Sequence, residues 1–179
     1  MSLVLDGSVG VTFPSGAVGN SALMSGTAVS LTTQTSIVFS GIPSWVKRIT
    51  IMYTNVTTSG ASVPIIQLGT SGGLVTTGYS STWAQGGYNT SAYGFTTTGL
   101  SIGTGVASVT SRVGICTIAL VSGNNWVMNG AGTFVYSGFG YSSTAAGNIA
   151  LASPLTQISL TTVNGTDQYT AGSINILYE

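Results

Sequence analysis

The ionisable side chains come first, because most enzyme chemistry depends on them, and this chain has very few. Its 179 residues include three Lys or Arg, three Asp or Glu, one Cys and no His. Charged residues make up 3% of the chain, whereas a typical soluble domain has about 25%. Acid–base, nucleophilic and metal-assisted catalysis all need titratable groups or metal ligands. The composition therefore predicts a protein that is not an enzyme, with no catalytic residues, no metal site and no cofactor.

The spacing of the ionisable residues supports the same expectation. A Ser-His-Asp or Cys-His site is impossible without His. A glycosidase needs two facing carboxyl groups, and the available ones, Asp6, Asp167 and Glu179, are scattered along the chain. Cys116 lies in an apolar run and has no second Cys to pair with, so we expect a small buried side chain. A polysaccharide-degrading enzyme is disfavoured accordingly.

Lys47 and Arg48 are the only adjacent charges, and they follow Trp45. These two cations are suited either to docking an acidic partner or to a structural role, in which an alkyl stem covers apolar surface and the head pairs with an acid. We favour the structural role and expect Asp167 to pair with Arg48 or with Arg112.

The charge balance also limits the partners. Three cations cannot supply the phosphate contacts of a nucleic-acid-binding surface, and a charge-driven membrane contact fails for the same reason. We expect no signal peptide, because no basic segment precedes a long apolar stretch, and no apolar run reaches the roughly 18 residues of a membrane helix. A chain with zero net charge has little repulsion between copies. A homo-oligomer is therefore expected.

Aromatic residues gather in a segment rich in Gly, Ser and Thr. Its candidate contact residues are Tyr79, Trp83, Tyr88 and Tyr93. Aromatic rings beside hydroxyl and amide groups can stack on sugars, but the same residues can anchor a subunit interface or fill a core. The sequence leaves glycan contact, interface and core open, and favours interface or core.

Strand-forming residues dominate the chain and the polar helix formers are scarce, which predicts an all-β fold. The pattern favours an antiparallel two-sheet β-sandwich, jelly-roll-like, with a short N-terminal arm. The clearest alternation runs from Val46 to Tyr53. Further strands are predicted at residues 28–31, 36–39, 63–68, 75–79, 93–97, 112–121, 126–128, 134–136, 148–151, 155–163 and 173–178.

Two regions are expected. Residues 1–26 form an N-terminal arm, with short strands at 3–5 and 9–13 around a turn, and residues 27–179 form the β-sandwich domain. The arm offers four large apolar side chains for attachment to another protein: Leu3, Leu5, Val11 and Phe13.

Several segments resemble a widespread family of tailed-bacteriophage virion proteins. The resemblance rests on residues 42–50 (IPSWVKRIT), 66–69 (IQLG), 77–80 (TGYS), 161–167 (TTVNGTD) and 171–179 (AGSINILYE). Residues 2–8 (SLVLDGS) and 11–16 (VTFPSG) are similar to modules of phage fibres. The likeness is thin from about Tyr88 to Leu155, and no active-site residues define the family.

The resemblance implies a β-sandwich carried on a virion, commonly as a trimer and assembled in the host cytoplasm. The favoured role is a capsid decoration or cement protein that attaches to the major capsid protein or another virion protein. The alternative is a head or tail fibre that contacts host glycans. These expectations agree with the composition, which predicts function through shape and contact rather than catalysis.

Overall fold

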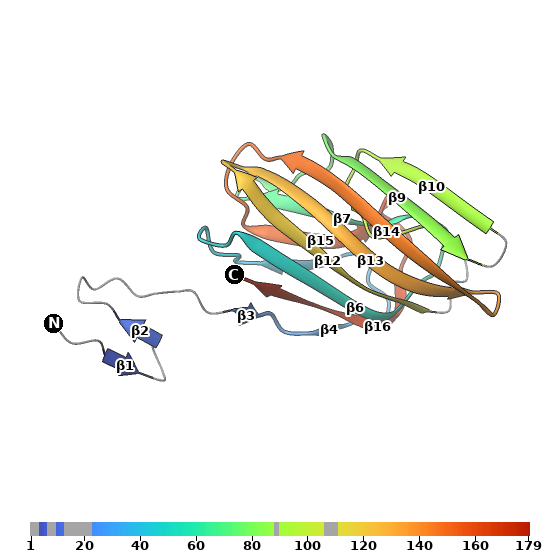
Figure 1. The fold of residues 1–179 in the computed structure, drawn as a ribbon, viewed down its shortest axis with the longest axis horizontal. Coiled ribbons are helices and arrows are strands. Elements are labelled where there is room, and N and C mark those ends of the chain that lie inside the picture. Colours follow the sequence, from blue (N-terminus) through green and yellow to red (C-terminus); the bar gives the residue numbers. More distant parts are fainter. Residues whose placement is uncertain (1–3, 7–9, 13–22, 88–89, 106–110) are drawn as a thin grey trace.

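A computed structural model describes residues 4–6, 10–12, 23–87, 90–105 and 111–179. These parts of the chain form an all-β structure in which two antiparallel sheets pack as a sandwich (Figure 1). The predicted fold class is confirmed. No helix among the described residues is long and apolar enough to cross a membrane.

The larger sheet contains nine strands within the described residues, all paired antiparallel. Their spatial order is β10 (Thr90–Thr96), β9 (Ser80–Gly87), β14 (Phe139–Ala150), β13 (Asn125–Tyr136), β12 (Ser111–Ser122), β6 (Arg48–Thr58), β16 (Tyr169–Tyr178) and β3 (Met24–Ser25), with β4 (Val29–Ser30) also on β16. Consecutive strands β12, β13 and β14 are neighbours, so this part is a simple meander.

The smaller sheet covers one face of the larger one. Its five strands in the described chain are β11 (Leu100–Ser101), β7 (Pro64–Thr70), β15 (Gln157–Thr162) and β5 (Ile37–Ser40), in this order, with β8 (Gly73–Leu74) beside β7. Every residue of β7 is buried. β7 is therefore a central core strand of the sandwich, and its buried Gln67 donates a side-chain hydrogen bond to the Thr98 carbonyl at 2.9 Å.

The core lies between the sheets and is made mainly of branched aliphatic side chains. Strand β6 shows how the sequence builds it. Ile49, Ile51 and Tyr53 are buried, while Thr50 and Met52, which alternate with them, are only half-buried. This confirms the predicted alternation from Arg48 to Tyr53, because successive side chains of a strand point to opposite faces. Val46 and Lys47 depart from the prediction: they precede β6, and Val46 is buried whereas Lys47 is exposed.

Glycines allow one large core side chain to fit. A Cβ atom at Gly114, on β12, would come too close to the Tyr53 hydroxyl, and one at Gly132 would lie 3.0 Å from it. The Tyr53 hydroxyl donates a hydrogen bond to the Ile102 carbonyl at 3.3 Å. The ring of Tyr53 therefore occupies space that larger residues at both glycine positions would fill.

The strand predictions were wrong in several places. Residues 75–79 are not a strand, because Val75 and Tyr79 belong to the connection between β8 and β9. Strand β9 was not predicted, and of β14 only the last three residues were. Strand β3 (Met24–Ser25) already pairs with β16, so the sheet begins before the boundary predicted at Thr27.

Strands β1 (Val4–Asp6) and β2 (Gly10–Thr12) form a separate two-stranded antiparallel sheet, with Leu5 opposite Val11. This sheet lies apart from the sandwich in Figure 1. It places two of the four predicted attachment residues side by side. The other two, Leu3 and Phe13, lie outside the described residues.

Candidate functional site

The outer face of the larger sheet is the strongest candidate surface, because its side chains point away from the smaller sheet and remain exposed. The strand registers align them in rows across the sheet. One row runs through Met52, Ile115, Ala131, Thr144, Ala84 and Tyr93. The next runs through Thr50, Thr117, Asn129, Ala146, Thr82 and Phe95. Neither row contains a charged residue.

One part of this face is aliphatic. Val113 and Ile115 on β12, together with Val135 on β13, are 42%, 50% and 39% exposed, and the register sets Val135 diagonally next to Val113. We call these three residues the aliphatic patch. Val127, which is 42% exposed on β13, lies apart from them, opposite Ala119. Single exposed apolar residues are ordinary on protein surfaces, but a group on two adjacent strands marks a contact surface.

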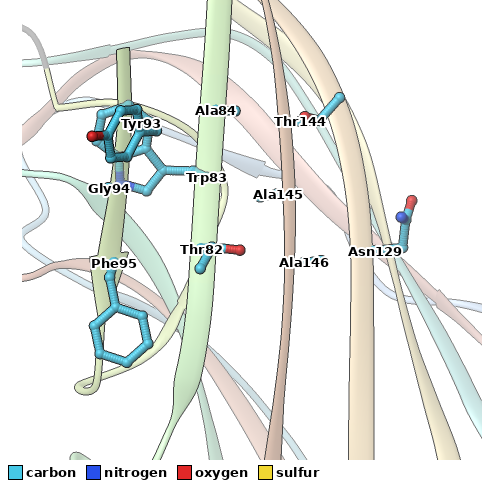
Figure 2. Close-up of a pocket in the computed structure, with 10 residues that line it drawn as sticks. All are labelled: Thr82, Trp83, Ala84, Tyr93, Gly94, Phe95, Asn129, Thr144, Ala145 and Ala146. Atoms are coloured by element: carbon cyan, nitrogen blue, oxygen red, sulfur yellow. The ribbon is translucent and has the colours of Figure 1, made fainter.

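A groove lies on the same face at the other side of the sheet, over β10, β9, β14 and β13 (Figure 2). Its volume is about 510 Å³. Tyr93 and Phe95 stand on one side of the groove, and Thr144 and Asn129 come from the strands on the opposite side. Within the part of the chain that the structure describes, no charged residue lines this groove.

Trp83 supports the groove from the inner side of the sheet. Strand pairing sets Trp83 opposite Gly94 and Ala84 opposite Tyr93, so the indole and the Tyr93 ring point to opposite faces. A Cβ atom at Gly94 would lie 2.5 Å from the Trp83 ring. Glycine at this position therefore lets the indole lie against the backbone of β10, beneath the exposed aromatic residues.

The predicted aromatic contact residues separate into different environments. Tyr93 is 86% exposed and Trp83 is half-buried against the core. Tyr79 is 3% exposed, and its hydroxyl accepts a hydrogen bond from the Leu68 amide at 2.7 Å and donates one to the Val75 carbonyl at 2.9 Å. Tyr79 is therefore a core residue, which corrects its prediction as a contact residue. Tyr88 lies outside the described residues.

The prediction that Arg48 pairs with Asp167 is wrong. Arg48 forms an ion pair with Glu179 instead, and the same two residues exchange backbone hydrogen bonds. Asp167 accepts hydrogen bonds from the Ser62 amide at 2.9 Å and from the Asn164 side chain at 2.7 Å. Its carboxylate therefore connects two loops, a role that the positions of the charged residues in the sequence did not indicate.

Arg112 is the buried cation of the described chain. It is 3% exposed and donates hydrogen bonds to the Thr58 hydroxyl and the Thr104 carbonyl, both at 3.3 Å. Burial lowers the pKa of Arg112 to about 10, and the nearby Tyr169 and Tyr53 oppose this shift. The surroundings of Arg112 are protein groups of the core, so it contributes to structure rather than to an exposed site.

Burial also raises the pKa of four groups in the core. It raises the pKa of Cys116 to about 12 and the pKa of Tyr79 to about 12. The pKa values of Tyr53 and Tyr169 are raised even further, mainly by burial. A thiol or phenol with so high a pKa is a poor nucleophile at neutral pH. No group of three or more metal-ligating side chains occurs among the described residues.

The aliphatic patch was not predicted, although its signal is present in the sequence. In the predicted strand 112–121, apolar residues occupy both alternating positions: Cys116 and Ile118 point inward, while Val113 and Ile115 point outward. A strand that is apolar on both faces indicates that both faces are covered.

The chain has no match among protein-family models, curated proteins or solved structures.

Proposed function

We propose that this protein is a non-enzymatic, oligomeric surface component of a bacteriophage particle, of the capsid decoration or cement type. The observation that carries the proposal is the outer face of the larger sheet, where the aliphatic residues Val113, Ile115 and Val135 are exposed on β12 and β13. Such a face is suited to burial against another protein subunit.

The size of this face is adequate for a subunit contact. Strands β13, β12, β6 and β16 have 12, 12, 11 and 10 residues. Strands lie about 4.8 Å apart and rise about 3.4 Å per residue, so these four strands, which include the aliphatic patch, offer a face of roughly 700 Å². A stable interface buries about 800 Å² on each partner. A second copy of the chain is the partner that the zero net charge favours, and a trimer is the state that the phage resemblance implies.

The N-terminal segment supplies a separate means of attachment. In this proposal the arm, with Leu3, Leu5, Val11 and Phe13, binds the major capsid protein or another virion protein, and the sandwich projects outward. Many identical weak contacts over a particle stabilise it by mass action. The virion location is inferred from the phage resemblance, and the oligomeric state is inferred from the composition and the outer face.

A head or tail fibre that contacts host glycans is the second candidate. It is favoured by the two aromatic residues of β10, Tyr93 and Phe95, which are 86% and 62% exposed. Both candidates place the protein on a virion, and neither requires catalysis.

A density map of the whole particle, with the copy number of the subunit, tests the proposal. Hundreds of copies on the capsid lattice, and particles that rupture at a lower temperature without the protein, are the expected results. Few copies at a fibre tip would favour the second candidate. A protein that is absent from particles, or that turns over a substrate, would overturn both.

A further inference from the structure

We propose that the groove over β10, β9, β14 and β13 is a binding site for a neutral glycan. The inference concerns this groove alone, and it applies whether the protein decorates a capsid or ends a fibre. It goes beyond the proposed structural role, because it assigns a ligand class to the part of the outer face that extends from the aliphatic patch to the edge strand β10.

Two aromatic side chains form one wall of the groove. Tyr93 and Phe95 are two residues apart on β10, so both rings point outward and stand about 6.8 Å apart along the strand. Strand β10 lies at the end of the sheet, and its two rings are 86% and 62% exposed. Exposed rings in such a row present apolar faces that can stack on the C–H faces of sugar rings.

Polar groups line the rest of the groove. Thr82, Thr144 and Asn129 are exposed and line the groove (Figure 2). Within the described residues, their side chains form no hydrogen bonds with protein. Hydroxyl and amide groups both donate and accept hydrogen bonds, which is what the hydroxyl groups of a sugar require. A site of aromatic rings with a few polar groups is the usual composition of a small-ligand pocket.

The shape and charge of the groove also fit a neutral glycan. Ala84 and Ala146 form part of its floor, and their small side chains leave the space between the aromatic and polar sides open. Three strand spacings separate β10 from β13, which makes the groove about 14 Å wide. Its volume of about 510 Å³ is within the range of ligand pockets. No charged residue lines it among those described, so a neutral glycan fits better than an acidic glycan or a nucleic acid.

The test is binding of the full-length protein to an array of neutral and acidic oligosaccharides, followed by titration of the best neutral glycan. We expect retention of neutral glycans only. Tyr93→Ala and Phe95→Ala should each weaken binding about tenfold, because each removes a stacking ring. Asn129→Ala tests the opposite side of the groove and should also weaken binding. Tyr136→Ala is the matched control, since Tyr136 is 38% exposed but does not line the groove.

Every outcome bears on the inference. Loss of binding in the groove variants with normal binding by Tyr136→Ala supports it. Absence of neutral-glycan binding, preference for acidic glycans, or equal binding by all variants overturns it. If Tyr93→Ala instead changes the oligomeric state, the rings belong to a subunit contact and the inference is also wrong. Circular dichroism of each variant checks folding, and attachment to particles, measured separately, tests the proposed function independently.

Discussion

On strand β12, Ile118 is fully buried, whereas Ile115, three residues earlier, is 50% exposed. The same contrast runs through β13, where Met128 is 3% exposed and Val127 is 42% exposed. The inner face of the larger sheet has the smaller sheet to cover it, and the outer face has aliphatic residues without such a cover in the described chain. Residue type alone therefore does not separate the core of this protein from its contact surface.

The largest expected effect comes from the matched pair Ile118→Ala and Ile115→Ala. Ile118→Ala should lower the free energy of unfolding by about 2–5 kcal/mol, because it opens a cavity in the core. Ile115→Ala should cost no more than about 0.5 kcal/mol in the separate subunit. Denaturant unfolding at several protein concentrations measures both. The Ile118→Ala loss should not depend on concentration, and the Ile115→Ala loss should grow where oligomers form; equal losses in the two variants would break the comparison.

Alkaline pH should destabilise the protein, because the inward-facing acids keep their protons in the folded state. The unfolded chain releases protons from Cys116 near pH 9 and from tyrosines near pH 10. The folded chain holds the protons of Cys116 and Tyr79 until about pH 12, so the stability from these groups is complete below pH 9 and is lost as the pH rises. Each such group contributes about 1.4 kcal/mol per pH unit at most.

Arg112 acts in the opposite direction. Its pKa of about 10 in the folded state lies below the ordinary 12.5, so the folded state gains relative stability between these values. The buried acids Cys116, Tyr53, Tyr79 and Tyr169 outnumber it, and the net change is a loss. Urea unfolding between pH 9 and 12 should show this fall, and Cys116→Ala should make its onset less steep. Stability that stays constant over this range would contradict the burial of these groups.

Substitution of Asp167, in a loop at one end of the sandwich, should have an intermediate effect on the free energy of unfolding. Asp167→Ala removes the acceptor for the Ser62 amide and the Asn164 side chain, and we expect a loss of about 1–3 kcal/mol. Asp167→Asn keeps one acceptor oxygen and should lose less. Thermal unfolding measures both variants, and an unchanged melting temperature for Asp167→Ala would remove its assigned role.

The smallest effect is expected for the ion pair of Arg48 with Glu179. Their side chains are 57% and 36% exposed, so water and salt weaken the attraction. Glu179→Gln should change the free energy of unfolding by less than about 1 kcal/mol, and high salt should remove the difference. A loss larger than that of Asp167→Ala would show that this exposed pair matters more than the loop contacts.

Much of the fold was predictable from local sequence. The alternation predicted a strand and, from Arg48 to Tyr53, which side chains share a face, because side-chain direction in a strand is a local property. Strand β14 was mostly missed, since its sequence is rich in small residues such as Gly140, Ser142 and Ala145 that give little alternation. Its position is set by pairing with β13 and β9, which a single sequence does not reveal.

The candidate surface was less predictable than the fold. Tyr79 and Tyr93 both lie in a segment rich in Gly, Ser and Thr, yet one is a core residue and the other is 86% exposed. The acid that pairs with Arg48 is Glu179 rather than Asp167 because β6 and β16 are adjacent in the sheet. Such facts depend on contacts between residues distant in sequence, so spacing and composition alone did not specify them.

Sedimentation of Val113→Asp and Val38→Asp tests the central claim most directly. Val113 lies in the aliphatic patch and is 42% exposed, while Val38 lies on β5 of the smaller sheet and is 47% exposed. The account predicts that the unchanged protein and Val38→Asp form the same oligomer, and that Val113→Asp sediments as a monomer. A monomeric unchanged protein, or an oligomer that survives Val113→Asp and dissociates with Val38→Asp, would contradict it.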